Sequence, residues 1–261
     1  MRIGFYQFRP LFGKPDHNCK KVVERLKSVR ADLVVLPELC FTGYLFKDRA
    51  EVKALAEDPR RSGIVQSLVA LCRKRGFHLV TGFTEKARDK YFNSALLLGP
   101  RGIRRIYRKL HFFMEDNSWF DPGDKELAID RVNGVGIGMM ICFDWVFPEV
   151  ARTLALAGAD VICHPSDLVL GHCQQAMLTR SLENGVFSVT ANRFGTDRRP
   201  HGEVKFTGRS QIVGPRGELL FRAPSQRDVV HVLKIDPARA RDKAITPQNQ
   251  LLKDRRPEFY A

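Results

Sequence analysis

Three side chains that could do chemistry together follow apolar runs at widely separated places in the chain. Glu38, Lys109 and Cys142 each come after a run whose composition predicts a buried strand. Because ligand crevices of α/β sheets lie at the carboxyl ends of strands, we expect these residues to border one pocket. A carboxylate, an ammonium group and a thiol would then meet there.

These three groups suit nucleophilic catalysis. Glu38 can take the thiol proton as general base and later activate water. The ammonium group of Lys109 can stabilise an oxyanion, and neighbouring carboxylates should keep it protonated. Pro148 suits the first position of a helix, and a helix N-terminus near Cys142 would favour the thiolate. Taken singly, each residue also fits a structural role, as a capping carboxylate, a solvated ammonium group or an inert core thiol.

Strand-like and helix-like segments alternate along the chain, and no long linker divides it. This pattern predicts one α/β domain over 1–261, with helices covering buried sheets. The glycine-interleaved run 132–141 is expected to be one strand that leads to Cys142, with its glycines permitting close backbone packing. We expect strands at 2–8, 31–36, 77–83, 94–98, 103–109, 135–141, 160–163, 186–191, 210–213, 218–221 and 229–235, and helices at 18–30, 64–75, 148–157 and 173–184.

Composition narrows the class of protein. The net charge is +14, from 43 basic and 29 acidic residues, but the basic residues are scattered. A solvated surface is therefore the preferred interpretation, and a nucleic-acid-binding protein is the alternative. No apolar run approaches the roughly 18 residues that a membrane-spanning helix needs. The N-terminus resembles no export signal, so we expect a cytoplasmic protein that acts neither on membranes nor on nucleic acid.

The six cysteines show no disulfide framework spacing, which favours free thiols. A metal site from Cys163, His164, His172 and Cys173 can be imagined, but their spacing matches no zinc pattern. The sequence therefore predicts no metal.

Three motifs resemble those of the nitrilase superfamily of carbon–nitrogen hydrolases. They are Leu36-Pro37-Glu38-Leu39, Tyr107-Arg108-Lys109-Leu110-His111 and Ile141-Cys142-Phe143-Asp144. Further similar segments occur in the right order along essentially the whole chain: Pro122-Gly123-Asp124, Gly158-Ala159-Asp160, Gly214-Pro215-Arg216-Gly217 and Arg255-Arg256-Pro257.

The resemblance implies a four-layer αββα sandwich that forms a homodimer or a higher homo-oligomer, with no metal or organic cofactor. It also implies that Cys142 attacks an amide, ureido or nitrile carbon and that water hydrolyses a thioester intermediate. Lys109 and the backbone N–H of Phe143 would hold the oxyanion.

One position departs from the family pattern. Many members carry a second glutamate after the lysine that helps to position the substrate. The matching position here is Asp116, with Glu115 beside it. Asp116 is the preferred interpretation, although a loop shift could bring in Glu115, and both could be solvated.

Four further residues flank the expected strand ends and could line the pocket: Tyr44, Trp145, Ser166 and Asp167. Simple core packing fits Tyr44 and Trp145 equally well.

The preferred function is hydrolysis of a non-peptide carbon–nitrogen bond in a small amide or ureido compound. A true nitrilase is the enzymatic alternative, and a catalytically retired interaction scaffold is the alternative outside that class. The C-terminal tail 251–261 carries two aromatic residues and is expected to pack on a partner subunit. A frayed basic tail is the competing interpretation.

Overall fold

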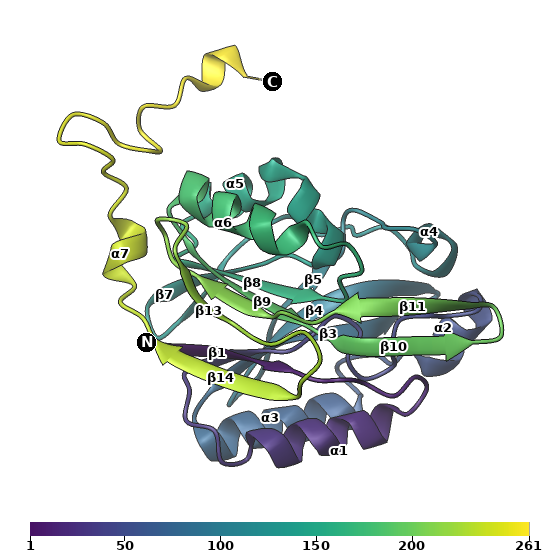
Figure 1. The fold of residues 1–261 in the computed structure, drawn as a ribbon. Coiled ribbons are helices and arrows are strands. Elements are labelled where there is room, and N and C mark those ends of the chain that lie inside the picture. The colour runs from purple at the N-terminus through teal and green to yellow at the C-terminus, as the bar shows by residue number, and fades with distance from the viewer. Residues whose placement is uncertain (261) are drawn as a thin grey trace.

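Two six-stranded β-sheets pack face to face, and helices cover their outer faces (Figure 1). The structure is a computed structural model that describes residues 1–260. Helices α1 and α3 lie on one sheet and α5 and α6 on the other, which gives the αββα order of layers. Their bounds are α1 Pro15–Leu26, α3 Gly63–Arg75, α5 Pro148–Leu156 and α6 Cys173–Asn184.

The first sheet has the strand order β14-β1-β2-β3-β4-β5, with parallel pairing from β1 through β3. Its strands alternate between two cores, since successive side chains point to opposite faces. Leu33 and Val35 of β2 face the core between the sheets, whereas Val34 packs under α1 and α3. The strands are β1 Arg2–Gln7, β2 Leu33–Val35, β3 His78–Ala87, β4 Lys90–Gly99, β5 Gly102–Arg108 and β14 Val229–Lys234.

The second sheet has the order β13-β12-β9-β8-β7-β6, with β7, β8 and β9 parallel. Gly136 of β7 lies so close to the backbone of Gly158 that a Cβ would sit 2.2 Å from its carbonyl oxygen. Gly136 therefore allows the close backbone approach that was expected of the glycines in this run. The strands are β6 Asp130–Val132, β7 Val135–Met139, β8 Val161–Ser166, β9 Phe187–Asn192, β12 Gln211–Val213 and β13 Leu219–Arg222.

The expectation of one strand over 132–141 is wrong, whereas the narrower expected strand 135–141 overlaps β7. Strands β6 and β7 form an antiparallel hairpin, with Val132 opposite Val135. Asn133 and Gly134 between them have φ values of 50° and 76°. Positive φ values at two consecutive residues, with the sequence Asn-Gly, are typical of the type I′ turn that connects two strands through a two-residue loop. The Asn-Gly pair was therefore the signal for this turn.

Several short elements were not expected from periodicity. They are α2 Arg49–Leu55, α4 Asp116–Trp119, the 3₁₀ helix η1 Cys142–Val146, the hairpin β10 Phe194–Arg199 and β11 Gly202–Thr207, α7 Ala238–Arg241 and η2 Pro257–Phe259. Two of them, η1 and α4, carry residues of the site described below.

The C-terminal segment leaves the sandwich after α7 and runs along the outer side of the α5–α6 layer (Figure 1). Lys243 attaches its start to the end of α6 by donating to the carbonyl oxygens of Asn184 and Gly185, at 2.9 and 2.7 Å. Phe259 and Tyr260 are exposed near its end. Within residues 1–260, no helix is both long and apolar enough to cross a membrane.

Candidate active site

Glu38 lies directly beyond β2 and is fully buried. Its Oε1 accepts hydrogen bonds from Asn93 Nδ2 at 2.7 Å and Lys109 Nζ at 2.9 Å. Its Oε2 accepts from the backbone N–H of Asp167 at 3.0 Å. A Cβ on Gly82 would lie 2.5 Å from the Glu38 Cα, so only glycine allows β3 to approach this closely. The carboxylate is therefore held rigidly from three sides.

Lys109 follows β5 and is also buried. Its Nζ lies 2.9 Å from Glu38 Oε1 and 2.5 Å from Asp116 Oδ2. Burial alone would lower the pKa of Lys109, but the charges of Asp116 and Glu38 outweigh it and hold the pKa well above its ordinary value. The side chain is thus a buried ammonium group, as expected from opposite charges.

Asp116, the first residue of α4, is fully buried. It accepts from Tyr44 Oη at 3.1 Å and from the Phe113 backbone N–H at 3.2 Å, besides Lys109. Glu115 is exposed. Of the two carboxylates that the sequence offered, Asp116 is therefore the one beside the lysine.

Cys142 begins η1 at the turn after β7, with a left-handed φ of 41°. A non-glycine residue in this region is held there by its surroundings. The Cys142 carbonyl oxygen lies 2.9 Å from Nε2 of the buried His164, and His164 Nδ1 lies 3.2 Å from Thr190 Oγ1. Burial lowers the pKa of His164 to about 4, so the ring is neutral at pH 7, with its proton on Nε2 to donate to the carbonyl.

In the free protein, the surroundings of Cys142 oppose the thiolate form that a nearby helix N-terminus would favour. Burial and the charge of Glu38 raise the pKa of Cys142 well above its ordinary value, and Lys109 opposes this shift without cancelling it. The resting group is therefore a thiol beside a carboxylate that can take its proton.

Asp144 is a positioning residue that the sequence reasoning missed. Its buried carboxylate accepts from the Ile141 backbone N–H at 2.8 Å and from Tyr107 Oη at 2.7 Å, and it lies 2.8 Å from His111 Nδ1. Tyr107 and His111 flank Lys109, so Asp144 ties the lysine segment to the cysteine turn. Its place two residues after Cys142 was the available signal.

The aromatic residues expected at the rim differ in where they lie. Tyr44 is buried and packs edge-on against Trp119 and Phe206, with ring centroids 5.6 and 6.0 Å apart. Trp145 is half-buried against the main core, and its carbonyl oxygen accepts from Arg180 Nε at 3.1 Å. The half-buried ring of Phe143 packs against Phe113. Tyr44 is thus the one joined to the charged cluster, through Asp116.

Ser166 and Asp167, at the end of β8, are both buried. Ser166 Oγ donates to the His164 carbonyl oxygen at 3.2 Å and so serves its own strand. Asp167 contributes its backbone N–H to Glu38, whereas both of its buried carboxyl oxygens have no hydrogen-bond partner. Burial raises the pKa of Asp167 well above its ordinary value against the opposing charge of Arg193, which favours a neutral acid.

The imagined metal site does not form. His164 is engaged with Cys142 and Thr190, and residues 1–260 contain no cluster of three or more ligand-type side chains placed to hold a metal ion.

Comparison with known proteins shows the family to which the chain belongs. The family model described as carbon-nitrogen hydrolase matches residues 5–244. The chain belongs to the carbon–nitrogen hydrolase family. It is 41% identical to a nitrilase of Pyrococcus abyssi, over 100% of this chain and 99% of that protein. It is 31% identical to an (R)-stereoselective amidase of a Pseudomonas species, over 98% and 92% of the two chains.

A solved structure of a carbon–nitrogen hydrolase from Helicobacter pylori superposes on this fold with a TM-score of 0.90. The two chains are 26% identical, and the match covers 100% of this chain and 96% of the other. The resemblance to the nitrilase superfamily and the four-layer fold are therefore confirmed, and the protein is an enzyme of the amidase and nitrilase type.

In this carbon–nitrogen hydrolase the buried cluster brings together a thiol, an ammonium group and two carboxylates. The charge of Glu38 raises the pKa of the Cys142 thiol, and Lys109 is kept cationic by two carboxylates. Because all of these groups are buried, their interactions are stronger than they would be in water. The arrangement suits attack of a thiol on a carbonyl-type carbon.

Proposed function

We propose that this enzyme hydrolyses a non-peptide carbon–nitrogen bond in a small amide or ureido compound through a thioester on Cys142. The observation that carries the proposal is the buried ammonium group of Lys109, which lies 2.9 Å from the Glu38 carboxylate and whose charge opposes the rise in the pKa of Cys142. Glu38, Lys109 and Cys142 are the proposed catalytic triad, and Asp116 positions the lysine.

In the first half of the reaction, Cys142 Sγ attacks the carbonyl carbon while its proton passes to Glu38. A carbon–sulfur bond forms, and the carbonyl oxygen becomes an oxyanion that Lys109 and the Phe143 backbone N–H stabilise. The carbon–nitrogen bond then breaks, and Glu38 returns the proton to the leaving nitrogen. Ammonia or an amine departs and leaves a thioester.

In the second half, Glu38 takes a proton from a water molecule, and the resulting hydroxide attacks the thioester carbon. The carbon–sulfur bond breaks, the proton returns to the sulfur of Cys142, and the acid product leaves. The high pKa of the free thiol fits this cycle, because a protonated thiol is the species that each turnover regenerates.

Nitrile hydrolysis is the second candidate, and the 41% identity to a protein named nitrilase favours it. A nitrile carbon would first give a thioimidate on Cys142. Addition of water to the thioimidate releases ammonia and leaves the same thioester.

Ammonia release from a panel of small amides, ureido acids and nitriles tests the proposal and separates the two candidates. We expect release by the wild type and by Cys19→Ala, a matched control that removes a different buried thiol in α1, and none by Cys142→Ala. An amide or ureido compound as the best substrate supports the first candidate, and a nitrile as the best supports the second. No release from any compound, together with a Cys142 that iodoacetamide does not alkylate, would favour a retired scaffold.

We further propose that the enzyme works as a homo-oligomer in the cytoplasm and that the tail 251–261 packs on a partner subunit. Phe259 is 71% exposed, and Leu156 of α5 and Leu182 of α6 are also exposed. Exposed apolar residues on one layer of the sandwich and on the tail support an interface. The six free buried thiols support a reducing compartment.

A further inference from the structure

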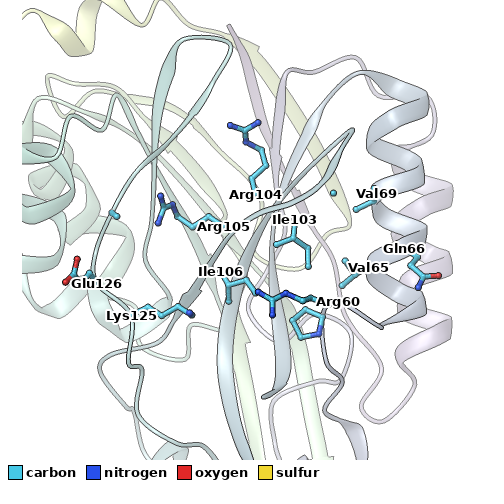
Figure 2. Close-up of a pocket in the computed structure, with 13 residues that line it drawn as sticks. Arg60, Val65, Gln66, Val69, Ile103, Arg104, Arg105, Ile106, Lys125 and Glu126 are labelled. Carbon is cyan, nitrogen blue, oxygen red and sulfur yellow. The ribbon is translucent and has the colours of Figure 1, made fainter. Parts of the chain in front are cut away.

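A hollow of about 820 Å³ lies between helix α3 and the edge strand β5, and the catalytic triad is not among its lining residues (Figure 2). Its floor is apolar. Val65 and Val69 of α3 face Ile103 and Ile106 of β5 across it, and three of these four side chains are only partly buried. The hollow forms because α3 covers the inner part of the sheet and leaves the outer face of β5 uncovered.

The rim of the hollow carries two cations that form no ion pair within residues 1–260. Within residues 1–260, the side chains of Arg60 and Lys125 form no ion pair or hydrogen bond, and both extend toward Ile106 (Figure 2). Arg105 points away from α3 (Figure 2), and its Nη2 donates to the Ile129 carbonyl oxygen at 2.9 Å. Arg60 and Lys125 are therefore the two cations without an ion pair on the α3 side of β5.

The neighbouring Arg104 provides an internal comparison. It forms a two-pronged contact with Asp130, with Nη2 2.8 Å and Nε 3.1 Å from the carboxylate oxygens. One acidic residue, Glu126, lines the hollow, and it forms no ion pair within the described part of the chain. The hollow therefore combines an excess of positive charge with an apolar floor.

We propose that the hollow between α3 and β5 is a second ligand site that binds a small organic anion with an apolar body. The volume lies within the range of ordinary small-molecule pockets. The hydrocarbon part would lie on Val65, Val69 and Ile106, and the carboxylate or phosphate head would pair with Arg60 and Lys125, which both extend toward Ile106. This proposal does not depend on the reaction at Cys142.

Calorimetric titration with octanoate tests the site directly, with octyl phosphate, inorganic phosphate and octanol as comparisons. The first two probes carry both an anionic head and an apolar body, and we expect both to bind. The tighter of them identifies the preferred head group. Inorganic phosphate and octanol each lack one half of this chemistry, and we expect both to bind at least about fivefold more weakly.

The variants Arg60→Gln and Lys125→Gln should each weaken octanoate binding about two- to fivefold, and the double variant should weaken it further. Lys74→Gln is the matched control, because it removes an exposed cation of α3 outside the hollow, and its affinity should equal that of the wild type. Thermal midpoints equal to the wild type's would show that the variants are folded.

Three results would overturn the proposal. If octanoate bound the double variant as tightly as the wild type, it would be binding outside the hollow, for example in the active site. Inorganic phosphate that binds as tightly as octanoate would show that the apolar floor contributes nothing. If neither octanoate nor octyl phosphate gave a heat of binding up to about 10 mM, the hollow would not be a site for small amphipathic anions.

Discussion

His164 should make the stability of the enzyme depend strongly on pH between about 6.5 and 4. Its side chain is fully buried under the cysteine turn, where Nε2 donates to the Cys142 carbonyl oxygen. Burial lowers the pKa from 6.5 to about 4; the hydrogen bond to Cys142 and the charge of Asp144 oppose this shift, and the charge of Lys109 adds to it. The unfolded chain therefore binds a proton at a higher pH than the folded protein does.

The sign and size of the effect follow from this difference. As pH falls below 6.5, protons bind the unfolded state first, so the free energy of unfolding decreases, and the loss is complete once pH passes below about 4. A shift of about 2.5 pKa units corresponds to about 3 kcal/mol in full, of which about 2.5 kcal/mol is lost by pH 4.5.

Urea unfolding of the wild type and of His164→Gln at pH 7.5 and 4.5 isolates this contribution. The glutamine amide can donate to the Cys142 carbonyl oxygen in place of Nε2 but does not titrate. We expect the wild type to lose about 2.5 kcal/mol more than the variant between the two pH values. Equal losses in the two proteins would refute the assignment of a buried, neutral His164.

Three further predictions concern the charged cluster and the tail. Asp116→Asn should lower kcat about ten- to a hundredfold, because Lys109 loses one of its two carboxylates and shifts; steady-state kinetics with kcat unchanged would contradict this. Asp144→Asn should lower the free energy of unfolding by about 1–3 kcal/mol, measured by urea unfolding, because an NH2 group replaces one of the two carboxylate oxygens and faces the donors that converge there; an unchanged midpoint would count against it. Deletion of 253–261 should shift sedimentation toward smaller species, and an unchanged profile would show that the tail does not hold subunits together.

The apolar runs predicted the α/β class and the meeting of the three proposed triad residues, whereas the order of the four layers came from the resemblance to the nitrilase superfamily. Apolar runs such as 31–36 indicate strands buried on both faces, and the carboxyl ends of such strands meet at one edge. Glu38, Lys109 and Cys142 follow β2, β5 and β7 and lie in one buried cluster.

The electrostatics of the cysteine could not be predicted in this way. Spacing indicated a helix near Cys142 and suggested a thiolate, but the pKa depends on burial and on the position of Glu38. The roles of His164 and Asp144 could not be predicted for the same reason. Their hydrogen-bond partners, Cys142 and Tyr107, lie 22 and 37 residues away along the chain.

The element boundaries that were missed depend on turns and tertiary cover rather than periodicity. The hairpin at Asn133 and Gly134 interrupts an apolar run that continues across it. The hairpin β10–β11 has few buried residues, yet it brings Phe206 against Tyr44. This contact joins residues far apart in the sequence, and the spacing of apolar residues within the hairpin does not indicate it.

The intact mass of the enzyme, quenched during turnover of the best substrate from the panel, tests the central claim most directly. We predict a mass increase equal to the acyl group of that substrate, located on the peptide that contains Cys142, and its absence in Cys142→Ala. Ammonia release without any such adduct, or with an adduct on another residue, would contradict the thioester mechanism and the triad of Glu38, Lys109 and Cys142.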